Sequence, residues 1–126
     1  MSFDLAVWYS DAAPTGQQAA EIYGNLCDQK PVEISANPAV DAFYHELIAK
    51  WQEIDTVPEE FVDDLDRCPW SCALDHTPVC VIMSCVWSRA ATVAVFVAEL
   101  AAKHGLVLFD PQSGTVILPP HMNPPE

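Results

Sequence analysis

The amino-acid sequence predicts a single α+β domain, in which a four-stranded mixed sheet carries its helices mainly on one face. Three observations lead to this prediction. The chain has 126 residues, which is the size of one domain. Hydrophobic residues make up 51% of it, enough for a core without disulfides or metals. Its apolar runs follow the order β-α-α-β-α-β-β, with no internal repeat.

The N-terminal half supplies one strand and two helices. Residues 3–9 are short, β-forming and apolar on both faces apart from one aspartate, which is typical of a buried strand. Thr15 is placed to cap a helix over residues 16–28. Asn37 and Pro38 begin a second helix, because Asn accepts from first-turn amides and Pro lacks one. This helix has one apolar stripe, formed by Val40, Phe43, Tyr44, Leu47, Ile48 and Trp51.

The C-terminal half contains the most apolar run of the chain. Residues 79–87 are apolar on both faces, which predicts a central strand. Ser88 is expected to cap a helix over residues 89–104, and Gly105 to end it. This helix and the strands on either side of it form a βαβ unit, whose two strands should run parallel.

The last part of the chain predicts a hairpin and a tail. Residues 106–109 are a strand, residues 110–114 a turn with Pro and Gly in turn-forming positions, and residues 115–118 the returning strand. The single domain is therefore expected to span residues 1–118. Residues 119–126 form a proline-rich tail that we expect to be loosely attached.

The charge balance favours some classes of partner over others. The chain has 18 acidic and 5 basic residues, a net charge of −13, and 15 of the acids lie in residues 1–76. Such a surface repels nucleic acid and anionic membrane, so neither is an expected partner. It attracts cationic proteins and speeds their association. Solubility alone is an equally good explanation of the charge.

Several features predict a cytoplasmic protein. No window has the ~18 uninterrupted apolar residues that a membrane helix needs. The start of the chain has no basic region and carries Asp4 within its apolar run, unlike a signal peptide. The five cysteines are odd in number, which disfavours a disulfide framework. Cys80 and Cys85 lie in an apolar run and are expected to be small buried side chains.

Residues 53–67, which read EIDTVPEEFVDDLDR, are the most unusual segment. This acidic segment holds seven carboxylates and ends in one base, with apolar residues between the charges. One interpretation is a solvated loop. The other is a surface for a basic protein, in which carboxylates steer the encounter and apolar side chains supply the contact. On the second interpretation the partner-binding residues are Asp55, Glu59, Glu60, Phe61, Asp63, Asp64, Asp66 and Trp70.

Trp70 has two interpretations of its own. Tryptophan is enriched among residues that dominate binding energy, so it could anchor a partner. It could equally fill the core beneath a long loop. Phe61 shares this ambiguity.

The spacing of Cys68, Cys72, His76 and Cys80 suggests a second class of function. Thiolates and imidazoles four residues apart are a plausible zinc ligand set, so a metal-binding or redox-responsive module on the first three is the alternative hypothesis. Two prolines within this span exclude one continuous helix, and the fourth residue belongs to a strand expected to be buried. The simpler interpretation is two loop thiols, a solvent-facing histidine and a core cysteine.

No residue pattern indicates catalysis or a cofactor. Asp75 and His76 near Cys72 are the residue types of a thiol triad, but such triads are recognised by geometry rather than by sequence proximity. The four glycines form neither a phosphate loop nor a dinucleotide fingerprint. We therefore expect a protein that is not an enzyme and carries no cofactor, and a small enzyme whose site the sequence conceals is the third alternative.

Three segments resemble a group of small bacterial proteins. They are MSFDLAVW at residues 1–8, VWSRA at residues 86–90 and HGLVLFDPQSG at residues 104–114. Some members of that group are encoded beside secreted polymorphic toxins, type VI effectors among them, and act as their immunity proteins. The resemblance covers the two ends of the chain and not the acidic middle. It implies a non-enzymatic protein that binds and neutralises a cognate, basic toxin domain such as a nuclease. It implies no catalytic residue, and it leaves the toxin's identity and the oligomeric state open.

Overall fold

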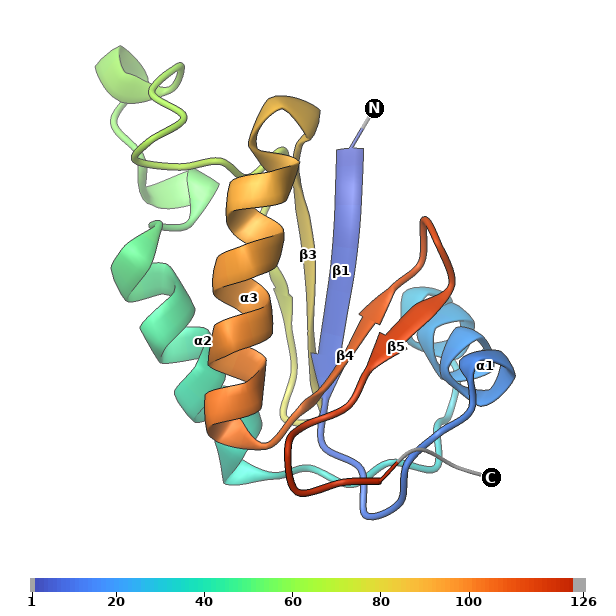
Figure 1. Cartoon of the computed structure of the whole chain (residues 1–126). Coiled ribbons are helices and arrows are strands. Elements are labelled where there is room, and N and C mark those ends of the chain that lie inside the picture. Colours follow the sequence, from blue (N-terminus) through green and yellow to red (C-terminus); the bar gives the residue numbers. More distant parts are fainter. Residues whose placement is uncertain (1, 124–126) are drawn as a thin grey trace.

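A computed structural model describes residues 2–123, which form one five-stranded sheet and three α-helices (Figure 1). The sheet order is β2-β3-β1-β4-β5, and every neighbouring pair is antiparallel. In chain order the elements are β1 (Ser2–Trp8), α1 (Gly16–Cys27), α2 (Pro38–Lys50), the 3₁₀ turns η1 (Ile54–Thr56) and η2 (Glu59–Phe61), β2 (Asp75–His76), β3 (Cys80–Val86), the 3₁₀ turn η3 (Trp87–Arg89), α3 (Ala90–His104), β4 (Val107–Asp110) and β5 (Thr115–Ile117).

The α+β class is confirmed, and the predicted four-stranded mixed sheet is wrong in two respects. The sheet has one strand more than predicted, because β2 is only two residues long and carries no periodic signal. The strands on either side of α3 do run in the same direction, as the crossover predicted. They are not neighbours, however, because β1 lies between β3 and β4 and pairs antiparallel with both. The central strand is therefore β1, and β3 lies next to it.

Helices cover both faces of the sheet. In Figure 1, α2 and α3 lie on one face and α1 on the other. Along β1 the side chains alternate, so that Leu5 and Val7 join the core under α2 and α3, whereas Ala6 and Trp8 join the core under α1. This alternation explains why the run is apolar on both faces. The expected helix distribution holds for α2 and α3, and α1 is the exception.

The first two helix starts are as predicted. Thr15 Oγ1 accepts from the Gln18 amide at 3.1 Å and Gln18 Oε1 accepts from the Thr15 amide at 2.9 Å, a reciprocal capping box. Asn37 Oδ1 accepts from the Ala39 amide at 2.8 Å, with Pro38 at the first helical position. Cap residues with free acceptors therefore mark these boundaries from sequence alone.

The predicted cap at Ser88 is wrong. Ser88 lies inside η3, and α3 begins at Ala90 with no side-chain cap. The Ala90 amide donates to the Trp87 carbonyl, so the 3₁₀ turn continues directly into the helix. The Trp87 carbonyl therefore accepts a hydrogen bond that a cap hydroxyl would otherwise accept.

Gly105 ends α3 in the left-handed conformation, with φ of 69°. A Cβ there would also lie 3.3 Å from His121 Cε1. Gly105→Ala should therefore lower the free energy of unfolding by about 1 kcal/mol or more. Gly24→Ala is the matched control, because a Cβ at this position within α1 meets nothing within 4 Å. It should instead stabilise by up to ~1 kcal/mol. Urea unfolding that gave the same sign for both variants would contradict this account.

Two residues of the predicted proline-rich tail contact the domain. Pro119 is buried. Met122 packs against the core under α1. Pro119 and Met122 thus lie against the domain, and residues 124–126 of the predicted tail lie outside the described residues.

Candidate partner-binding surface

The acidic segment projects from the body of the protein. Figure 1 shows it in green beyond the C-terminal end of α2, away from the sheet. Within it the backbone forms only the single-turn helices η1 and η2. Pro58 directly precedes η2, where Pro suits a helix start. The like charges disfavour a more compact arrangement, so the segment presents its side chains to solvent.

The carboxylates of the acidic segment are mostly free of basic partners. Asp66 pairs with Arg89 Nη2 at 3.0 Å. In residues 2–123 no lysine or arginine lies within ion-pair distance of the other five exposed carboxylates. These five are Asp55, Glu59, Glu60, Asp63 and Asp64. They constitute a negative surface that the protein itself does not neutralise.

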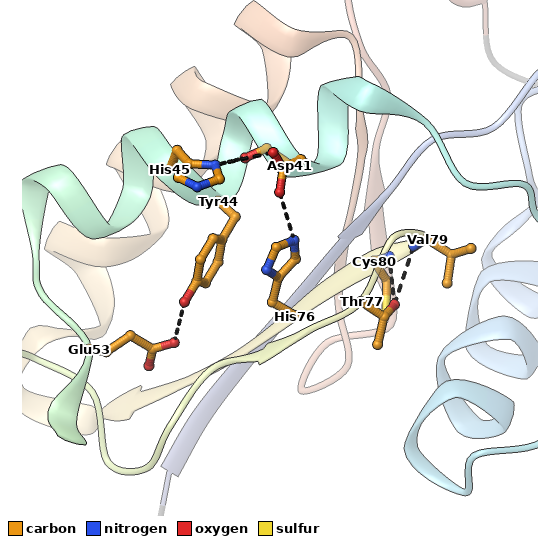
Figure 2. Close-up of polar contacts among 8 residues, drawn as sticks. All are labelled: Asp41, Tyr44, His45, Glu53, His76, Thr77, Val79 and Cys80. Atoms are coloured by element: carbon orange, nitrogen blue, oxygen red, sulfur yellow. Dashed lines mark hydrogen bonds and ion pairs between the residues drawn. The ribbon is translucent and has the colours of Figure 1, made fainter. Parts of the chain in front are cut away.

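Glu53 has a different place from the rest. Its Oε2 accepts from the Tyr44 hydroxyl at 2.7 Å (Figure 2). Its Oε1 accepts from the Leu74 amide at 2.9 Å. Burial and the hydrogen bond to Glu53 raise the pKa of Tyr44 to about 12. Glu53 therefore joins the start of the acidic segment to α2 and to the chain before β2. The sequence did not distinguish it from its neighbours, because its partners are distant in sequence.

Four of the apolar residues of the acidic segment form two groups. Ile54 and Val57 pack against the core under α2 and α3. Phe61 and Val62 face outward, with 38% and 53% of their surface exposed. Arg67 lies over the Phe61 ring, 4.0 Å from its centroid, and so covers part of it. The inward group anchors the segment, and the outward group is apolar surface beside the free carboxylates.

Trp70 is not part of this surface. Its side chain is 2% exposed, and its Nε1 donates to the Trp51 carbonyl at 3.3 Å. The flanking backbone runs along the outer edge of β3, where the Ser71 amide donates to the Ser84 carbonyl. The prediction of Trp70 as a partner-binding residue is therefore corrected, because its ring fills the core below the acidic segment.

Trp87 is an exposed tryptophan that the sequence analysis assigned to the central strand. It is 47% exposed and packs edge-on against Phe3, with ring centroids 5.3 Å apart. Trp87 lies in η3, whose Arg89 pairs with Asp66, so this turn is joined to the end of the acidic segment. In the sequence, the signal for this exposure was the position of Trp87 directly before Ser88, where the apolar run stops.

The structure does not assemble the alternative metal site. Cys68 is buried and Cys72 is exposed. His76 stacks on Tyr44, with centroids 3.9 Å apart, and its Nε2 lies 3.5 Å from Asp41 Oδ1 (Figure 2). Burial also raises the pKa of the Cys68 thiol, which opposes formation of the thiolate that binds metal. Across residues 2–123 no three Cys, His, Asp or Glu side chains are placed to share a metal ion.

The predicted burial of Cys80 and Cys85 is confirmed. Cys80 and Cys85 are 2% and 1% exposed, one on each face of β3. Burial raises the pKa of Cys85 to about 11, so it is an inert core thiol.

Comparisons with known protein families, with characterised proteins and with solved structures found no match for this chain. No helix within residues 2–123 has the length and apolar character needed to cross a membrane.

Proposed function

We propose that this chain is a non-enzymatic immunity protein that binds and neutralises a basic toxin domain in the cytoplasm of the cell that makes the toxin. One observation carries the proposal: on a projecting segment, five carboxylates that have no basic partner within residues 2–123 occur together with exposed apolar side chains. The resemblance of three segments to immunity-type proteins supports it. Toxin domains that cut nucleic acid are basic where they hold phosphate, and an acidic surface is complementary to such a site.

The two kinds of side chain have different roles in this proposal. Asp55, Glu59, Glu60, Asp63 and Asp64 lie in solvent, so they act at a distance and raise the rate of encounter with a cationic protein. Phe61 and Val62 lose water only when the partner docks. Burying apolar surface opposes dissociation more than it speeds encounter, so these two residues set the lifetime of the complex.

Neutralising four of the free carboxylates tests the role of the acidic segment. In a variant with Glu59→Gln, Glu60→Gln, Asp63→Asn and Asp64→Asn, association with the proposed cognate toxin domain should slow several-fold at low ionic strength. The difference should narrow as salt screens the charges. The fold should be intact, because all four side chains are exposed. Stopped-flow association and far-UV circular dichroism measure the two effects.

The matched control removes the same charge elsewhere. Asp11→Asn, Glu21→Gln, Glu33→Gln and Glu99→Gln change four exposed carboxylates outside the acidic segment. This control should associate nearly as fast as the wild type, because nearby charges dominate steering. Equal slowing in both variants would mean that the acidic segment affects association only through the net charge of the protein. Full growth protection and unchanged association in the first variant would mean that the segment is only a solvated loop.

A further inference from the structure

A cleft of about 420 Å³ lies at the end of α2 remote from the acidic segment. It opens between the first turn of this helix, at Asn37 and Pro38, and the chain that leaves β2, at Thr77 and Pro78. Because α2 has 13 residues, its two ends are about 20 Å apart. The cleft is therefore separate from the surface to which the proposed function is assigned.

The walls of the cleft are mainly apolar, with one carboxylate among them. Two proline rings and Ala36 form apolar lining, and Asp41 and His76 add polar groups. The volume is in the range of sites that take a small molecule or a single large side chain. A site of this composition selects a group that has both a flat apolar face and a charged edge.

The Asp41 carboxylate has spare capacity as an acceptor. Figure 2 shows it between two imidazoles. Oδ2 lies 3.3 Å from His45 Nδ1, and Oδ1 lies 3.5 Å from His76 Nε2. Both distances exceed the usual range for N–H···O hydrogen bonds, and His45 Nδ1 is closer to the Asp41 carbonyl, at 2.9 Å. Among residues 2–123 no lysine or arginine pairs with Asp41.

The helix end in this cleft does not make it an anion site. The first turn of a helix attracts anions through its free N–H groups. Here Pro38 has no N–H, the Ala39 amide donates to Asn37 Oδ1, and the Val40 amide donates to the Asn37 carbonyl at 3.0 Å. The Asp41 carboxylate adds a negative charge to the same turn. The donors are used and the local charge is negative, so the cleft favours a cation.

The polar walls of the cleft are held in place by neighbouring contacts. His76 is stacked on Tyr44 with an angle of 17° between the rings, and Tyr44 is held by Glu53. Thr77 Oγ1 accepts from the Val79 amide at 3.3 Å and from the Cys80 amide at 3.2 Å, which shapes the turn on the other side (Figure 2). A preformed cleft loses little conformational entropy when it is filled.

We propose that this cleft binds an arginine side chain of a protein partner, with the guanidinium edge on Asp41 and its flat faces against the rings of Pro38 and Pro78. Arginine fits better than lysine, because guanidinium is planar, more weakly hydrated and shaped to meet a carboxylate with two donors. This contact is additional to the acidic segment, and it can be tested without a toxin.

The test is an NMR titration of the wild-type protein with N-acetyl-arginine methylamide at about pH 8. We expect saturable shifts at Asp41, His76 and Thr77 in the low-millimolar range, on the order of 4 kcal/mol of binding free energy. The lysine derivative should bind more weakly. The citrulline derivative, which has the same shape without the charge, and inorganic phosphate should leave these signals in place.

Asp41→Asn should weaken binding of the arginine probe by roughly tenfold or more, since it removes a charge-assisted hydrogen bond. Asp28→Asn, at the end of α1, is the matched control and should bind like the wild type. Asp41 is exposed, so the variant should fold. Equal shifts with citrulline, equal affinity for lysine, saturable phosphate binding or an unaffected Asp41→Asn variant would each overturn the proposal. None of these outcomes changes the association-rate test of the acidic segment.

Discussion

Val81→Asp is expected to lower the free energy of unfolding by about 3 kcal/mol or more. Val81 is fully buried in β3, beside Val7 of β1 and His76 of β2. Its side chain belongs to the core under α2 and α3, whose buried residues are all hydrophobic, so a carboxylate there would lose its hydration. The midpoint of thermal unfolding should fall by ~10 °C or more, as measured by circular dichroism.

The same substitution at Val95 is the matched control. Val95 lies on α3 and is 60% exposed. Valine and aspartate have similar helix propensities, so Val95→Asp should change stability by less than about 0.5 kcal/mol. If Val81→Asp unfolded at the temperature of Val95→Asp, the assignment of β3 to the interior of the sheet would be wrong.

Trp70→Ala should cost about 3–5 kcal/mol, the usual range for emptying a buried aromatic site. Trp70 is 2% exposed and meets the Trp51 ring edge-on, with centroids 5.9 Å apart. The substitution also leaves the Trp51 carbonyl without the Nε1 donor. Urea unfolding should show the loss as a lower midpoint, with little change in slope.

Trp87→Ala separates a core tryptophan from a surface one. Trp87 is 47% exposed and has one aromatic neighbour, Phe3, so its truncation should cost roughly 1–2 kcal/mol. Equal losses in the two variants would contradict the distinction between them. A Trp70→Ala protein as stable as the wild type would return Trp70 to the candidate partner-binding residues.

The candidate surface was predictable in its charge but not in its boundaries. Like charges repel and stay in water, so the exposure of Asp55, Glu59, Glu60, Asp63 and Asp64 follows from composition. The burial of Trp70 does not, because a tryptophan has the same local signal whether a core or a solvent-facing loop lies beneath it. The cleft at Asp41 was also hidden, since His76 reaches it from a strand too short to predict.

Local sequence patterns predict the helix starts at Thr15 and Asn37, the helix end at Gly105, and the apolar strands of the core. These features depend on contacts within a few residues or on periodicity, which are visible along the chain. The position of β1 between β3 and β4, which makes the sheet antiparallel, is visible in the folded protein and not in the chain. The same is true of the burial of Trp70 and the exposure of Trp87. Both outcomes arise from long-range packing, because strands with two apolar faces can pair with any neighbour until the helices cover them.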